Sequence, residues 1–245
     1  MARMGRFAMA LCVFSMVANA QEDPLAWFPL QVGSRWVYEH EWKSGDRNRP
    51  ELDRWATQEA ITGWVTIPEG VVVLREVKQQ GNLPGKTITN RVIDPNGQLR
   101  YVEHQGNNHS AHLIARDCEP YLIHGNCIYA IGGGWDGQRR ELRPEYRKYL
   151  SEAAVAPDFC FPLQMGRAWG NVKNGIPWRV EPAREGVGSF LPAEYAGAIH
   201  IFSSHFGSGG SEDVWFQKGA GIVGEHYMHN GSYDEYTKKL LLFLR

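Results

Sequence analysis

Histidine, a side chain that binds metals and transfers protons, is most concentrated in one short stretch of the sequence. His104, His109 and His112 lie within nine residues that are rich in Asn and Gly. Three imidazoles could bind zinc, but no carboxylate or cysteine stands at a supporting spacing. We therefore interpret them as solvated loop residues. His200 and His205 are five residues apart, which places them on opposite faces of a strand. We predict neither a metal site nor a cofactor.

Signatures of hydrolases and of nucleotide-binding proteins are missing from the sequence. It has no Gly-x-Ser-x-Gly motif, which exposes a nucleophilic serine, and no His-Glu-x-x-His motif, which binds zinc. The glycine-rich run at 132–137 lacks the Lys-Ser/Thr pair of a phosphate-binding loop. Asp and Glu are abundant, but the sequence alone does not place two carboxylates at the separations that glycosidases use. We predict a non-enzymatic protein with no catalytic residue; the alternative is a secreted carboxylate-dependent hydrolase acting on polysaccharide.

Tryptophan is unusually frequent, with nine residues in the chain. Aromatic side chains can stack on the faces of sugars or line an apolar pocket, so they could form a binding surface. Core packing is the interpretation that we favour for most of them, because they stand beside Val, Ile or Tyr in predicted strands. If the protein binds a ligand or a protein partner through an aromatic surface, we predict Trp36, Tyr38 and Trp42 as ligand-binding residues.

The elements that must position these side chains are mostly strands, because β-branched and aromatic residues alternate with polar ones. In 34–43, the residues Trp36, Tyr38, His40 and Trp42 share one face, while Arg35, Val37, Glu39 and Glu41 share the other. The stretches 71–78 and 86–93 follow the same pattern. A turn at 94–97 predicts a hairpin with 98–104, and a glycine-rich loop predicts another between 198–206 and 212–217.

The strongest short hairpin signal is Asn230-Gly231 near the C-terminus. A two-residue turn there places His229 opposite Ser232 and His226 opposite Glu235. The second pair could form an exposed ion pair when the imidazole is protonated, but we favour the interpretation that the two side chains simply lie on a solvated face.

One segment breaks the strand pattern. Residues 143–156 begin with Pro144 at a first helical position and carry apolar residues at helical spacing, so we predict one short helix there. The predicted fold class is mainly β, an antiparallel sheet arranged as a sandwich or an open barrel in two halves. Because no flexible linker flanks the helix, we expect a single domain over 21–245, with halves at 21–141 and 158–245 and a connecting helix at 142–157.

A ten-residue segment occurs twice in the chain, at Trp27–Trp36 and at Cys160–Trp169, with six identical positions. Both copies read Phe-Pro-Leu-Gln-x-Gly-x-x-Trp. Pro fixes φ on an extended approach, Gly permits a turn and Trp opens a strand with a large buried area. We favour the interpretation that each copy leads into a sheet over that of a repeated ligand motif.

The first 20 residues have the pattern of an export signal. Arg3 and Arg6 precede an apolar run at 7–17, and Ala18-Asn19-Ala20 predicts signal-peptidase cleavage before Gln21. The apolar run is too short to cross a bilayer and no other stretch approaches the required length, so we predict no transmembrane segment. We expect a periplasmic or extracellular protein. Removing the signal leaves 24 Lys and Arg against 27 Asp and Glu, which argues against a nucleic-acid partner.

Three cysteines remain after cleavage, in a compartment where disulfides form. We predict a disulfide between Cys118 and Cys127, which would close the short loop 119–126. Three thiols allow three single pairings, so Cys160 is an alternative partner. No Cys or His spacing of a metal site is present.

Several of these motifs together resemble a group of uncharacterised exported bacterial proteins. The motifs are the Phe-Pro-Leu-x-x-Gly-x-x-Trp opening after the signal, its second copy, and the C-terminal segments 213–225 and 229–235, about 45 residues in all. The resemblance implies an exported bacterial β-rich protein. It implies no activity, cofactor or site residue.

Overall fold

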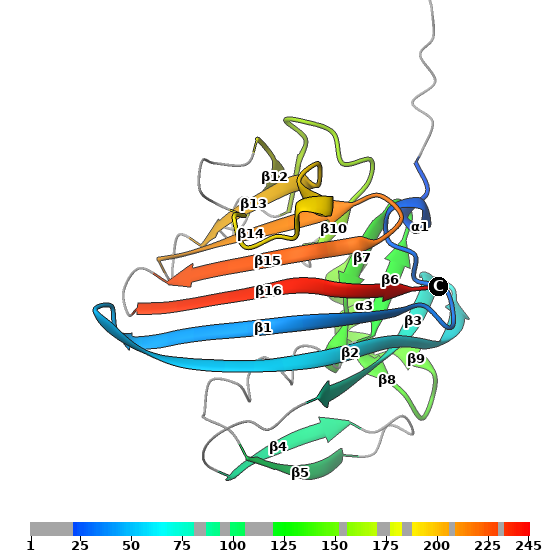
Figure 1. The fold of residues 1–245 in the computed structure, drawn as a ribbon. Coiled ribbons are helices and arrows are strands. Elements are labelled where there is room, and N and C mark those ends of the chain that lie inside the picture. The colour runs from blue at the N-terminus through cyan, green and yellow to red at the C-terminus, as the bar shows by residue number, and fades with distance from the viewer. Residues whose placement is uncertain are drawn as a thin grey trace, which may run out of the picture.

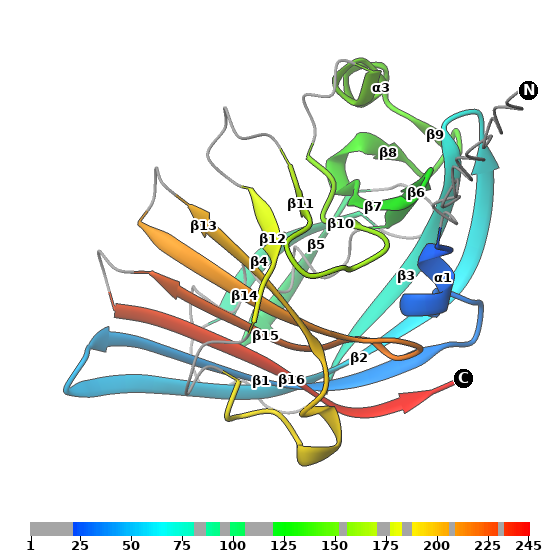
Figure 2. The same ribbon diagram turned by 90° about the horizontal axis from the view of Figure 1, so that it is seen from above.

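The chain folds mainly into antiparallel β-structure, as predicted. The computed structural model describes residues 22–80, 87–93, 99–105, 120–151, 156–170, 177–182, 188–205, 209–229 and 233–245. Twelve strands form one sheet that curls strongly and nearly closes (Figure 1 and Figure 2). Of the two predicted arrangements, the open barrel is confirmed and the sandwich is not.

The large sheet is continuous from one predicted half of the chain to the other. Its strands are β1 (Arg35–Asp46), β2 (Arg49–Ile67), β3 (Gly70–Gln80), β6 (Tyr121–His124), β7 (Cys127–Ala130), β10 (Phe159–Cys160), β11 (Ala168–Trp169), β12 (Trp178–Val180), β13 (Ile199–His205), β14 (Gly210–Gln217), β15 (Gly221–His229) and β16 (Tyr233–Leu244). Across the sheet they lie in the order β10-β7-β6-β3-β2-β1-β16-β15-β14-β13-β12-β11. The first strand and the last strand of the chain are therefore neighbours, and the two halves share one sheet.

Shorter elements flank this sheet. They are the strand pairs β4 (Thr87–Ile93) with β5 (Leu99–Gln105) and β8 (Trp135–Asp136) with β9 (Glu141–Leu142), the helices α1 (Pro24–Trp27) and α3 (Pro144–Ser151), and the 3-10 turns η1 (Gly132–Gly134) and η3 (Ala193–Tyr195). Helix α3 confirms the predicted helix as far as residue 151, and 152–155 lie outside the described residues. In the described part of the chain, no helix has the length and apolar character needed to span a membrane.

The alternation predicted for the first strand is observed in β1. Trp36, Tyr38 and His40 are at most 1% exposed. The indole nitrogen of Trp36 donates to the carbonyl of Ala220 at 2.7 Å, and the hydroxyl of Tyr38 donates to that of Ile222 at 3.0 Å. These bonds satisfy the polar atoms that burial would otherwise leave unpaired. We call this side of the sheet the inner face and the opposite side the outer face.

The main hydrophobic core joins side chains from strands all along the sheet, whose curl is seen from above in Figure 2. Phe28 packs edge-on against Trp36 of β1 and Phe216 of β14, with ring centroids 5.5 and 5.6 Å apart, and against Tyr121 of β6 at 5.8 Å. Phe159 of β10 lies 4.8 Å from Phe216. Strands that are far apart across the sheet therefore meet through aromatic rings, which stabilises the curled shape.

The two copies of the repeated segment share the turn at their glycine, although Phe161-Pro162 is a cis peptide bond and Phe28-Pro29 is not. Their glycines, Gly33 and Gly166, have φ values of +97° and +81°, in the left-handed region that favours glycine. Each glycine ends a turn that leads into a strand, β1 for the first copy and β11 for the second. The interpretation of each copy as a lead into the sheet is confirmed.

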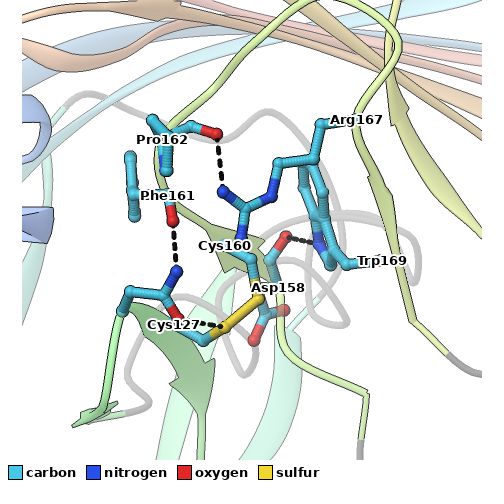
Figure 3. The surroundings of a disulfide bond; sticks show 8 residues. Cys127, Asp158, Cys160, Phe161, Pro162, Arg167 and Trp169 are labelled. Carbon is cyan, nitrogen blue, oxygen red and sulfur yellow. Dashed lines mark hydrogen bonds between the residues drawn. A yellow bond between two sulfur atoms is a disulfide. The ribbon is translucent and has the colours of Figure 1, made fainter. Parts of the chain in front are cut away.

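The disulfide joins Cys127 to Cys160, so the predicted Cys118–Cys127 bond is wrong (Figure 3). The two cysteines are direct partners in the register of β7 and β10, with Cα atoms 4.1 Å apart. Nearness along the sequence favoured Cys118, but strand pairing brings Cys160 to the same place from 33 residues away. Cys118 lies outside the described residues.

The chain around the disulfide is fixed by hydrogen bonds from the second repeat (Figure 3). Arg167 donates from Nη1 to the carbonyl of Pro162 at 3.0 Å, and the indole of Trp169 donates to the carbonyl of Asp158 at 3.2 Å. The repeat and the disulfide together hold the short strand β10 against β7.

Two predicted hairpins are confirmed by their pairing. β4 and β5 are antiparallel, with Ile93 opposite Leu99, and β13 and β14 are antiparallel, with His205 opposite Gly210. The alternation of β-branched and polar residues between turn signals was sufficient to locate both.

The C-terminal hairpin is present, but its predicted register is wrong by two positions. His226 lies opposite Thr237, and Glu235 lies opposite Met228. The observed register pairs Tyr227 with Tyr236 on the inner face, where burial of the two rings against each other stabilises the pairing. A shift of two positions keeps every side chain on its face. His226 consequently still contacts Glu235, with Nε2 and Oε1 3.3 Å apart.

Candidate functional site

The predicted ligand-binding residues lie on the inner face of β1. Trp36 and Tyr38 are core side chains, so a ligand could reach them only by displacing the core. Trp42 is half-buried near Tyr236, with ring centroids 6.0 Å apart, in a small cluster with Trp55 and Tyr227. The structure thus brings the three predicted residues to one face but does not form an open aromatic surface from Trp36 and Tyr38.

A groove of about 380 Å³ lies on the opposite, outer face, over β1, β16 and β15. We call it the outer groove. Its floor is polar, and one wall is formed by the segment 188–190. The lining side chains are Glu39, Glu41 and Lys43 of β1, Glu235, Thr237 and Lys239 of β16, His226 and Met228 of β15, and Ser189 and Phe190 of the wall. Three strands that are adjacent only through the sheet pairing therefore build one site.

The wall is held down by close contacts with β14 and β15, which it crosses on the outer side of the sheet (Figure 1). Gly224 has no side chain beneath Leu191, and a Cβ there would lie 2.3 Å from Leu191 Cδ2. The ring of Phe190 packs edge-on against Trp215, with centroids 5.4 Å apart and an interplanar angle of 86°. The missing side chain at Gly224 is what allows this segment to approach the sheet and close the groove.

Opposite charges in the outer groove are already paired. Lys43 Nζ lies 3.1 Å from Glu41 Oε1 and 3.4 Å from Glu235 Oε2. Glu41 also contacts Arg54, with Oε2 and Nη2 2.6 Å apart, and Glu39 pairs with Lys239. Lys43 and Glu41 lie two residues apart on β1, and the other pairs follow from cross-strand register, since Lys43 is directly opposite Glu235 in the sheet.

Ion pairing keeps the groove side chains charged. Partial burial would raise the pKa of Glu41 and Glu235, but hydrogen bonds from Arg54 and Lys43 to the first, and from Tyr233 and Lys43 to the second, lower both. Burial would lower the pKa of Lys43, yet its two carboxylate partners raise it. These two carboxylates and the ammonium group between them are ionised at neutral pH.

A histidine pair bridged by a carboxylate lies at the edge of the groove. His200 Nε2 is 2.8 Å from Asp213 Oδ1, and His226 Nδ1 is 3.5 Å from Asp213 Oδ2. Asp213 is only 3% exposed, while the other nitrogen of His226 faces Glu235. This arrangement fixes the orientation of the His226 ring where it meets the groove.

The sequence did not reveal this histidine pair or the groove wall. His200, Asp213 and His226 belong to three separate strands, and only the registers of β13, β14 and β15 bring them together. Alternation would have placed each on the outer face, but not beside the others. Of the predicted histidine group, His104 lies in β5, and residues 109 and 112 lie outside the described residues.

Glu41 and Glu235 of the groove do not form the acid–base pair that the hydrolase alternative requires. A glycosidase needs one carboxyl group that stays protonated to donate to the leaving group, together with a second that is ionised. Glu41 and Glu235 flank Lys43 and both have lowered pKa values. Neither is suited to donate a proton. Within the described residues, no three His, Cys, Asp or Glu side chains converge as a metal site.

Comparisons with known proteins give little further information. No protein-family model and no curated protein matches the sequence. Among solved structures, a candidate lipoprotein from Parabacteroides distasonis is similar with 11% identity and a TM-score of 0.41, over 91% of this chain and 100% of that chain. A candidate exported protein with a YmcC-like fold from Bacteroides fragilis has 10% identity and a TM-score of 0.37, over 89% and 99%. Both scores are too low for fold or function to be taken from these structures.

Proposed function

We propose that this chain is an exported, non-enzymatic β-rich protein that binds a small molecule in the outer groove. The observation that carries the proposal is the groove itself, a space of about 380 Å³ with Phe190 and Met228 beside fixed polar side chains. Small-molecule sites in proteins typically span roughly 300–1,000 Å³ and combine apolar walls with a few placed polar groups. The aromatic side chain that contacts the ligand is then Phe190.

Export is supported by the N-terminal sequence and by the disulfide. The signal pattern at 1–20 predicts cleavage before Gln21, and disulfides such as Cys127–Cys160 persist in oxidising compartments. Mass spectrometry of the protein recovered from a bacterial periplasm or culture medium should find Gln21 as the new N-terminus. Recovery of a secreted protein that retains residues 1–20 would contradict this part of the proposal.

Binding is tested by screening the purified protein against a small-molecule library with ligand-observed NMR. Each hit is then titrated against Phe190→Ala and against Tyr149→Ala, an exposed aromatic of α3 that does not line the groove. We expect hits whose affinity falls at least about tenfold in Phe190→Ala and is unchanged in Tyr149→Ala. A library without hits, or hits whose affinity is unchanged in Phe190→Ala, would refute the groove as the binding site.

The same purified protein should be incubated with polysaccharide substrates to test the hydrolase alternative. We expect no product. Turnover that is abolished by Glu41→Gln or Glu235→Gln would replace the binding function with catalysis.

A further inference from the structure

Resting on the proposed function, we infer that the ligand of the outer groove is a neutral molecule with several hydroxyl groups, a sugar or a polyol, that lies against Phe190. The inference concerns the chemistry of the ligand, and it follows from how the groove distributes its charges, its hydrogen-bonding atoms and its apolar surface.

The charges argue against a ligand with a net charge. Each carboxylate that lines the groove has a basic partner: Lys239 for Glu39, Lys43 for Glu235, and both Lys43 and Arg54 for Glu41. A cationic ligand would have to compete with these partners and lie near their charges. An anionic ligand would meet the carboxylates that flank each lysine. Either one would lose an existing pair for every pair it gained.

The hydrogen-bonding atoms fit hydroxyl groups. The ammonium group of Lys43 only donates and the carboxylate of Glu235 only accepts, and the two are 3.4 Å apart. A hydroxyl group both donates and accepts, so one hydroxyl can bind the lysine and the glutamate together without separating them. The side chain of Thr237, which also lines the groove, adds a group that can donate or accept. A molecule with hydroxyl groups on neighbouring carbons can use this row of alternating partners.

The apolar wall fits the C–H face of a sugar ring. Phe190 is half-buried, and its orientation is fixed by Trp215 at 5.4 Å and by His226 at 6.4 Å between ring centroids. Met228 lines the groove as well. Trp215 is only 3% exposed, so Phe190 is the aromatic surface that a ligand meets. An aromatic face beside alternating donors and acceptors suits a ring that is apolar on its faces and polar at its rim.

The inference is tested by calorimetry with matched probes: neutral hexoses and hexose disaccharides, their 2-amino derivatives, and their uronate derivatives. We expect a neutral probe to bind most tightly, with less than about a twofold change in affinity between low and high salt, because no net charge is neutralised. Phe190→Ala should weaken it at least about tenfold, and Tyr149→Ala should not. A charged derivative that binds more tightly than its neutral parent would overturn the inference.

A double variant separates hydrogen bonding from charge. Lys43→Gln/Glu235→Gln removes one positive and one negative charge and leaves polar groups that can donate and accept at both positions. Affinity for the neutral probe should stay within about fivefold, whereas Lys43→Met/Glu235→Leu should abolish binding. Thermal unfolding of both variants is measured to verify that they fold. Loss of binding in the first variant would overturn the inference.

Failure of the inference differs from failure of the proposed function. If no probe of the three classes binds but the library yields a groove ligand that depends on Phe190, the ligand class is wrong and the binding function stands. If the library yields no groove ligand either, the proposed function fails together with the inference.

Discussion

The two faces of the central strands carry the same chemistry under different solvation. On the inner face, Lys238 Nζ lies 3.1 Å from Glu59 Oε1, and the two side chains are 4% and 3% exposed. On the outer face, Lys43 Nζ lies 3.4 Å from Glu235 Oε2, and their side chains are 31% and 24% exposed. Both lysines therefore pair with carboxylates at comparable distances, and only one of the two pairs is open to a ligand.

The two charges of the inner pair are enclosed by other groups. Arg75 Nη1 lies 2.9 Å from Glu59 Oε2, and Lys238 Nζ lies 4.3 Å from the centre of the Tyr38 ring. Burial would raise the pKa of Glu59, but Lys238 and Arg75 outweigh it and lower the pKa to about 2. The inner charges are thus fixed parts of the core, while the outer charges remain partly solvated.

Breaking the inner pair should have the largest effect. Lys238→Met leaves Glu59 and Glu225 without their lysine inside the sheet, and we expect a loss of about 3–5 kcal/mol in the free energy of unfolding. Urea denaturation measures it. The control Lys78→Met, whose lysine is 64% exposed beside Glu76, should change stability by less than about 1 kcal/mol. Similar losses in the two variants would show that burial does not separate the two kinds of pair.

Acid should weaken the inner face through His40. Its ring is buried and stacks on Trp55, and its nitrogens bond to Tyr236 and Thr57. Burial, aided by the charge of Lys238 and opposed by that of Glu59, lowers the pKa of His40 from 6.5 to about 3.

Below about pH 6.5, His40 is protonated in the unfolded chain but stays neutral in the folded chain. The contribution of His40 to the free energy of unfolding is therefore fully present above that pH and is lost as the pH drops towards 3. The loss attributable to His40 at pH 5 is about 2 kcal/mol. Urea midpoints between pH 7 and pH 5 should fall less steeply for His40→Gln than for the natural protein. An equal fall of the urea midpoint in His40→Gln and in the natural protein would show that His40 is not held neutral in the folded state.

Much of the inner face was predictable, because strand alternation is a local property. The pattern of β1 separated the buried side chains from Glu39 and Glu41 without any tertiary information. Residue type was less informative about the role of these side chains. Aromatic residues such as Trp36 and Tyr38 can either fill a core or stack on a ligand. Their burial depends on strands that lie far away in the sequence.

The outer groove was not predictable for a different reason. It needs the registers of β1, β16 and β15 together with a wall that crosses them, and none of these is a local property of the chain. The C-terminal hairpin shows this: the turn signal located the hairpin, but inner-face pairing of Tyr227 with Tyr236 set a register two positions away. His226 and Glu235 are in contact although the predicted register was wrong, because a shift of two positions keeps both side chains on their face.

The wall of the groove should respond to a single methyl group. Gly224→Ala places a Cβ against Leu191, which has to move, and we expect a loss of about 1 kcal/mol together with weaker binding in the groove. The control is Gly63→Ala, where a Cβ would meet only Leu74 Cδ1, at 3.5 Å. Chemical shifts of the amide groups of 188–191 report the displacement. Unchanged shifts in Gly224→Ala would show that Leu191 does not rest on Gly224.

The smallest effect should come from the outer pair that corresponds to the inner one. In Lys43→Gln, Glu235 keeps the hydroxyl of Tyr233 and the nearby ring of His226, and Glu41 keeps Arg54. Because these groups remain partly solvated, we expect stability to change by less than about 1 kcal/mol at low salt and by less still at high salt. Urea denaturation at two salt concentrations measures both values. A loss as large as that of Lys238→Met would mean that the outer pair is a structural element like the inner one and that its solvation does not weaken it.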